Sequence, residues 1–142
     1  MRRSVSTLWS TLAFALVLTA AAPAPARADE GAAVRDVIGA QIRAFLREDV
    51  TEAFGFASPG IRRLFGTPEV FGHMVRHGYP MVWKPRDWRF SALAPQGEGL
   101  RQTVVITNAV GRLHVADYDM VLVEGVWRID GVRLRPAEGA GA

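Results

Sequence analysis

One face of a predicted strand at residues 112–123 carries two side chains that can exchange protons. Alternation along the strand places His114 and Tyr118 on this face with the apolar residues Ala116, Met120 and Leu122. An apolar wall with a few hydrogen-bonding groups is typical of a small-molecule pocket, where a desolvated imidazole or phenol can act as an acid or base. The alternative is structural: Tyr118 packs its ring with the hydroxyl at the rim, and His114 meets water.

The opposite face of this strand carries two carboxylates, Asp117 and Asp119, between apolar residues at both ends. Paired carboxylates can share a proton or hold a cation when they are close. Residues two apart on a strand, however, lie ~7 Å apart. We therefore expect exposed acids here, and a homodimer contact through the apolar ends of this face of the sheet.

A second pair of titratable side chains, His73 and His77, stands four residues apart on a predicted helix. This spacing can chelate zinc, but a zinc site needs a third ligand, and no Glu follows His73 as it does in metalloprotease helices. His73 also points away from the apolar stripe of its helix, so the pair is predicted to face solvent. We predict neither a metal site nor a cofactor.

Tryptophans alternate with cations from Trp83 to Arg89, where the helical half of the chain passes into the strands. Such a segment can bind an anionic glycan, lipid or partner surface. The alternative is that its tryptophans pack inward while its charges face water. The candidate ligand-binding residues are Asp49, Tyr79, Trp83, His114, Tyr118 and Met120, and no catalytic residue is assigned.

The elements that must position these residues change from helical to extended along the chain. Apolar residues three and four apart predict helices over 32–47, 51–57 and 61–65, the second of them capped by Thr51, and a longer helix that begins at Thr67-Pro68 and ends at Gly78. Alternation predicts strands over 87–94, 101–108, 112–123 and 126–134, joined by glycine-containing turns and hence antiparallel. A change of parity within the last strand predicts a bulge at Asp130-Gly131.

These elements predict an α+β domain over residues 29–135, in which N-terminal helices pack on a curved antiparallel four-stranded meander sheet. The sheet is expected to curl around the long first helix, since this buries both apolar faces. Residues 136–142 are expected to form a disordered tail.

The first 28 residues have the features of a secretory signal peptide. Arg2-Arg3 precedes an apolar run of about 15 residues, and the small residues of Ala26-Arg27-Ala28 form a cleavage site before Asp29. The run is shorter than the ~20 residues that span a bilayer, so no stable membrane anchor is expected. Cleavage after Ala28 predicts a periplasmic or secreted protein, exported by the general secretory route in preference to the twin-arginine route.

Removal of the signal changes the charge of the protein. Three of the 17 Lys and Arg residues precede Asp29, whereas all 14 acids lie at or after it, so the formal charge of +3 falls to zero. A neutral exported chain is not expected to bind nucleic acid. With no Cys, it offers neither a disulfide nor a thiolate nucleophile.

Three spaced segments carry a resemblance to a known family. They are the run from Phe54-Gly55-Phe56 through Ser58-Pro59-Gly60 to Phe65-Gly66, then Met74-Val75 with Gly78-Tyr79-Pro80, and finally Gly125-Val126-Trp127-Arg128-Ile129-Asp130-Gly131. Together they resemble a bacterial family catalogued as domain of unknown function 4864, over nearly all of the mature chain. The resemblance implies an NTF2-like (cystatin-like cone) superfold, in which a curved sheet and its helices enclose a pocket. The family pattern often has Cys after the final Gly, where this chain has Val132.

The superfold hosts several unrelated activities, so function must be argued from the site. The leading hypothesis is a non-catalytic module that binds a small apolar or amphipathic ligand, or a protein partner. The second is a pocket acid/base enzyme of the isomerase or hydrolase type, and the third is a homodimerisation scaffold.

Overall fold

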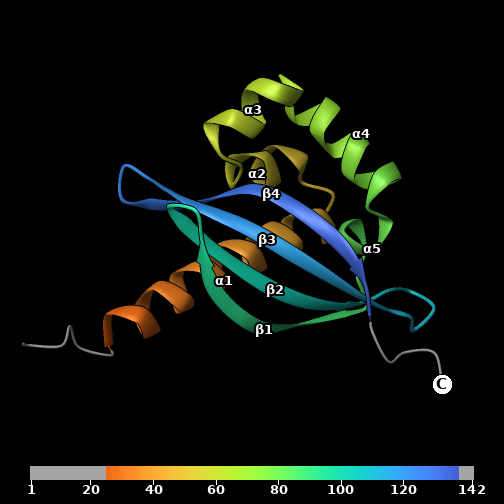
Figure 1. Ribbon diagram of the computed structural model, residues 1–142. Helices are drawn as coiled ribbons and strands as arrows, with labels where there is room; N and C mark the ends of the chain where they lie inside the picture. Colours follow the sequence, from red (N-terminus) through yellow and green to blue (C-terminus); the bar gives the residue numbers. More distant parts are fainter. Residues whose placement is uncertain (1–24, 138–142) are drawn as a thin grey trace, which may run out of the picture.

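The computed structural model describes residues 25–137 (Figure 1). Most of the predicted signal peptide (1–24) and most of the predicted tail (138–142) lie outside the described residues. Helices precede strands, as predicted: α1 (Pro25–Leu46), α2 (Val50–Gly55), α3 (Pro59–Phe65), α4 (Pro68–Gly78), α5 (Pro80–Trp83), then β1 (Asp87–Gln96), β2 (Gly99–Thr107), β3 (Leu113–Val123) and β4 (Val126–Pro136). No described helix is long and apolar enough to cross a membrane.

The four strands form one antiparallel meander sheet in the order β1-β2-β3-β4. A two-residue turn joins β3 to β4, and both its residues, Glu124 and Gly125, have positive φ values of 49° and 79°, as a tight hairpin of this kind requires. At the β1–β2 turn, a Cβ on Gly99 would lie 1.9 Å from the carbonyl oxygen of Met120, so only glycine fits there. α1 runs across one face of the sheet, and α2, α3 and α4 lie beside β4 (Figure 1).

The predicted bulge in β4 is confirmed. Asp119 pairs with Gly131 and the next residue, Met120, with Ile129, which leaves Asp130 as the extra residue. The bulge does not require glycine, because Gly131 does not have a positive φ and a Cβ on it would meet nothing within 4 Å. A second, unpredicted bulge lies in β1 between Phe90 and Leu93. Gln102 of the adjacent strand β2 stabilises this bulge. Its Nε2 donates to the carbonyl oxygens of the two bulge residues, Ser91 and Ala92, at 3.2 and 3.1 Å.

Some predicted helix ends agree with the structure and others do not. The Thr67 hydroxyl accepts from the Val70 amide at 3.2 Å, and α4 ends at Gly78, as predicted. The predicted cap at Thr51 is wrong, because α2 begins at Val50 and Asp49 caps it by accepting from the Glu52 amide at 3.0 Å. α1 begins before residue 32, and β4 extends through Pro136 into the predicted tail.

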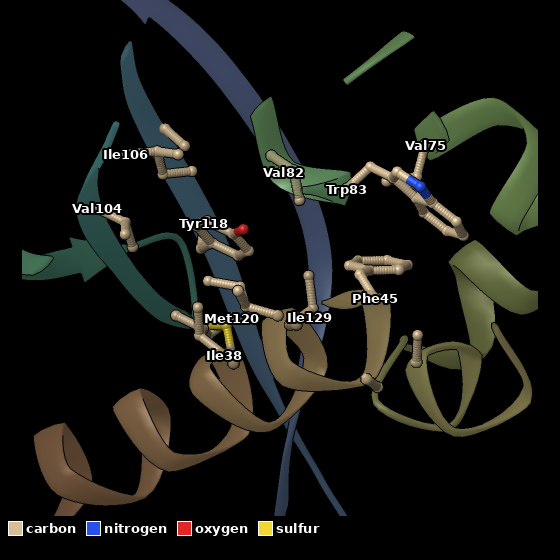
Figure 2. Close-up of a cluster of buried hydrophobic side chains, with 14 of the residues drawn as sticks. Ile38, Phe45, Val75, Val82, Trp83, Val104, Ile106, Tyr118, Met120 and Ile129 are labelled. Carbon is tan, nitrogen blue, oxygen red and sulfur yellow. The ribbon is translucent and has the colours of Figure 1, made fainter. Parts of the chain in front are cut away.

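The core lies between α1 and the inner face of the sheet (Figure 2). Ile38 of α1 lies beside Met120 of β3, and Phe45 of α1 lies beside Ile129 of β4, all of them buried. Because α1 covers the middle of the sheet, the inner residues of β2 and β3 are sealed from solvent. Space for a ligand is left where the shorter helices meet β4.

Candidate functional site

A cavity of about 220 Å³ lies between α1, α3, α4, α5 and β4. Its lining is almost wholly apolar and comes from both halves of the chain. The lining residues are Gln41, Phe45, Ala57, Ile61, Leu64, Phe65, Phe71, Met74, Val75, Tyr79, Val82, Ile129, Gly131 and Val132. Leu64 is 73% exposed and so marks the rim, whereas Phe45 and Ile129 are buried at the inner end. We call this cavity the α3–α4 pocket.

The packing of the α2–α3 connection against β4 shapes the pocket. Ala57 forms a parallel bridge with Ile129, and the Ser58 amide donates to the Ile129 carbonyl oxygen at 2.8 Å. The Ser58 hydroxyl donates to Asp130, the extra residue of the bulge, at 2.6 Å and accepts from the Ile61 amide at 3.2 Å. The bulge in β4 therefore fixes the start of α3, which forms one wall of the pocket.

Phe71 is the centre of an aromatic cluster that forms a second wall. Its ring centroid lies 5.9 Å from that of Phe45, 5.3 Å from Phe54 and 5.6 Å from Phe65. Phe65 meets it edge-on at 66°, an arrangement that aromatic rings favour. Phe45, Phe65 and Phe71 all line the pocket, so a bound ring would meet other rings.

Among the described residues, two polar side chains line the pocket, those of Gln41 and Tyr79. Gln41 is 2% exposed, and its Nε2 donates to the carbonyl oxygen of Ala53 at 3.1 Å. The Tyr79 hydroxyl lies 3.5 Å from the Val132 carbonyl oxygen, at the limit of a hydrogen bond. No charged side chain of the described residues lines the pocket.

Of the six predicted ligand-binding residues, the structure places one, Tyr79, in this lining. Tyr118 and Met120 are buried in the core instead, at 0% and 1% exposure, because α1 seals their face of β3. Burial raises the pKa of Tyr118 well above its ordinary value, and its hydroxyl has no hydrogen-bond partner in the described part of the chain. His114 is half-buried and accepts from the Asn108 side-chain amide at 3.3 Å.

The other two predicted residues also serve the structure. Asp49 is exposed and caps α2. Trp83 is 8% exposed and packs on Phe45, with ring centroids 5.6 Å apart, while Lys84, Arg86 and Arg89 are exposed. This agrees with the interpretation in which the aromatic residue packs inward and the charges face water.

Trp83 also borders a second, polar hollow that contains His73 and His77. The two imidazole centroids lie 4.1 Å apart, and His77 Nδ1 is 2.9 Å from the His73 carbonyl oxygen. Across residues 25–137, no group of three or more His, Cys, Asp or Glu side chains is placed to hold a metal ion.

The two acids of β3 are paired on the outer face of the sheet. Arg101 meets Asp119 with two hydrogen bonds, at 2.7 and 3.1 Å. Arg135 meets Asp117 in the same way, at 2.6 and 3.2 Å, and Thr103 also donates to Asp117 at 2.9 Å. The guanidinium of Arg135 holds the pKa of Asp117 below its usual range. Asp117 is 6% exposed, so the expectation of an exposed acid at that position is wrong.

Comparison with known protein families identifies the family of this chain. The family model described as Domain of unknown function (DUF4864) matches residues 27–142. The chain belongs to this family. Val132, at the position where the family pattern often has Cys, lines the α3–α4 pocket. No curated protein matches the chain.

Solved structures support the predicted fold. An NTF2-like protein of unknown function from Silicibacter pomeroyi DSS-3 matches with 20% identity and a TM-score of 0.54, over 77% of this chain and 98% of that one. An NTF2-like protein of unknown function from Shewanella baltica OS155 matches with 13% identity and a TM-score of 0.52, over 78% and 97% of the two chains. The fold is NTF2-like, and at these identities the likeness concerns the fold alone.

Proposed function

We propose that this chain is an exported, non-catalytic binding module that holds a small apolar ligand in the α3–α4 pocket. The observation that carries the proposal is a preformed cavity of about 220 Å³ with an apolar, aromatic lining. A dry apolar cavity of roughly 150 Å³ is large enough for benzene. A ligand of one or two rings therefore suits this pocket.

The lining supports binding in preference to proton transfer. An acid/base enzyme needs a titratable group within hydrogen-bond reach of the substrate. Within residues 25–137, the one titratable side chain that lines the pocket is that of Tyr79, with no carboxylate or imidazole beside it in the lining. Tyr118, one of the two side chains predicted to be able to act as an acid or base, is buried in the core.

Ligand-dependent unfolding tests the proposal, with indene as the probe because it is an apolar molecule of two fused rings. A ligand that binds only the native state raises its stability with concentration, by about 2.7 kcal/mol at 100 times the dissociation constant. We expect the thermal midpoint to rise with indene concentration. An unchanged midpoint up to the solubility limit of indene would contradict the proposal.

Two tryptophan substitutions on α4 separate the pocket from the surface. Met74→Trp places a larger side chain in the lining and should abolish the indene response. Val70→Trp is the matched control, since Val70 lies on the same helix, is 53% exposed and does not line the pocket. A response retained in Met74→Trp would place indene elsewhere.

As a second candidate, we propose that two copies pair through the outer face of the sheet. On that face the charges cancel within each of two ion pairs, Arg101–Asp119 and Arg135–Asp117. The neighbouring Val115 and Val121 are only half-buried. Light scattering should give twice the monomer mass, and Val121→Arg should return the protein to a monomer. A monomer at every concentration of the unaltered protein would exclude this dimer.

A further inference from the structure

Gln41 carries one of the two polar side chains in the described lining of the α3–α4 pocket. Gln41 is 2% exposed, yet it lines the cavity. Its side chain makes one hydrogen bond in the described structure, from Nε2 to the carbonyl oxygen of Ala53 at 3.1 Å. Because a carbonyl oxygen only accepts, the nitrogen of the amide must face Ala53.

The other half of the amide is therefore unused. Oε1 can accept two hydrogen bonds, and no donor of residues 25–137 reaches it. Among the described residues the enclosed side-chain atoms without a partner are Gln102 Oε1 and the Tyr118 hydroxyl, so Gln41 Oε1 is open to solvent in the pocket. A ligand donor there replaces water and gains the net value of one hydrogen bond. Phe45 lies one helical turn along α1 and also lines the pocket, so an aromatic surface adjoins the acceptor.

Charge limits the ligand further. No charged side chain of the described lining can pair with an ionised ligand, and an unpaired charge is costly to bury in an apolar cavity. A carboxylate or an ammonium ion on the ligand would thus oppose binding.

We propose that the pocket takes a neutral ligand of one or two rings that carries a single N–H or O–H group, which donates to Gln41 Oε1. This inference rests on the proposed function and adds the chemical class of the ligand and the residue that selects it. In this proposal Gln41 binds the ligand and takes no part in a reaction.

Indole and indene test the inference, because the two molecules have nearly the same shape and only indole has an N–H donor. By calorimetry we expect indole to bind the mature protein about three- to tenfold more tightly than indene, the range set by one hydrogen bond. Indole-2-carboxylate should bind more weakly than indole. Equal binding of indole and indene would overturn the inference, as would tighter binding of the carboxylate.

Variants of the two polar lining residues locate the effect. Gln41→Met keeps the length of the side chain and removes the acceptor, so indole and indene should then bind equally. Tyr79→Phe removes the other polar group of the lining and should leave the preference intact. Loss of the preference in Tyr79→Phe, or its persistence in Gln41→Met, would overturn the assignment of Gln41. If Gln41→Met does not fold, the Tyr79→Phe result and the indole–indene comparison still decide.

The outcomes separate the two proposals. If indene binds in the pocket but indole has no advantage, the proposed function stands and the inference on ligand class fails. If neither molecule binds, the proposed function itself fails.

Discussion

Tyr118 has a buried hydroxyl without a partner, which makes the effect of its removal predictable. Leaving such a group unsatisfied costs about 1–3 kcal/mol relative to its hydration in the unfolded chain. Tyr118→Phe should therefore leave the free energy of unfolding unchanged or raise it by about 1 kcal/mol, measured by urea denaturation. Tyr118→Ala is the control and should destabilise by about 3–5 kcal/mol through the cavity it creates. A loss of more than 1 kcal/mol in the Phe variant would mean that the hydroxyl has a partner.

Asp117 gives the fold a predictable dependence on acid. Its pKa is lowered in the folded state, mainly by Arg135, so the folded chain holds this proton less tightly than the unfolded chain. The resulting stabilisation is present above the ordinary Asp pKa of about 3.9 and is lost as pH falls toward the lowered value. We expect the urea midpoint of the wild type to drop between pH 6 and pH 3, and to drop less in Asp117→Asn.

Asp36→Asn provides the comparison for that measurement, because Asp36 is an exposed residue of α1. Its acid response should match that of the wild type. If Asp117→Asn and Asp36→Asn respond alike, the Arg135 pair does not set the acid stability.

The face of the strand on which a site residue lies was easier to predict than whether that residue lines the pocket. Parity along β3 correctly places Tyr118 and Met120 on the inner face, but it does not tell how closely α1 packs there. α3 and α4 supply six of the fourteen lining residues of the pocket, and the apolar residues of these helices also fit an ordinary core stripe. Gln41 is a polar residue on the apolar face of α1, and that break in the pattern is the signal by which it could have been found.

Between elements, the contact of α2 with α4 depends on Gly72. A Cβ at this position would lie 2.3 Å from Val50 Cγ1 and 3.0 Å from Val50 Cβ. Alanine gains up to about 1 kcal/mol of helix propensity over glycine, but forced overlap in a packed site costs typically 1–3 kcal/mol. We expect Gly72→Ala to lower the free energy of unfolding by about 1–2 kcal/mol.

Val50 supplies the compensating change for this contact. In the double variant Val50→Ala with Gly72→Ala the overlap is removed. The loss of unfolding free energy in this variant should therefore be smaller than the sum of the losses in the two single variants. Strict additivity would show that α2 and α4 can move apart at no cost.

The elements themselves were largely predictable because their signals are local. The Thr67-Pro68 start of α4, the glycine turns of the sheet and the bulge at Asp130 each follow from a few neighbouring residues. The bulge in β1 was missed, since it is held by Gln102 from the adjacent strand. The bridge between Ala57 and Ile129 is likewise a long-range pairing, which a local sequence pattern does not predict.

For the whole molecule, burial along α1 supports a proposal on the N-terminal boundary of the domain. Ala28, Asp29 and Glu30 are exposed, whereas Gly31, the next residue, is buried. The family match begins at residue 27, close to the predicted mature start. We propose that the domain keeps its core when residues 1–28 are removed, even though α1 begins at Pro25.

Export can then be tested on the whole chain. When the full-length gene is expressed in a bacterial host, cleavage after Ala28 should release a soluble protein into the periplasm or medium whose intact mass begins at Asp29. This product should unfold cooperatively at the same temperature as a protein expressed directly from Asp29, because both contain every buried residue of the described core. Ala28→Lys places a large charged residue at the cleavage site and should block processing, leaving the longer chain at the membrane. Recovery of a full-length, membrane-extracted product from the unaltered gene would overturn the assignment of a signal peptide and, with it, the proposal that the pocket operates outside the cytoplasm.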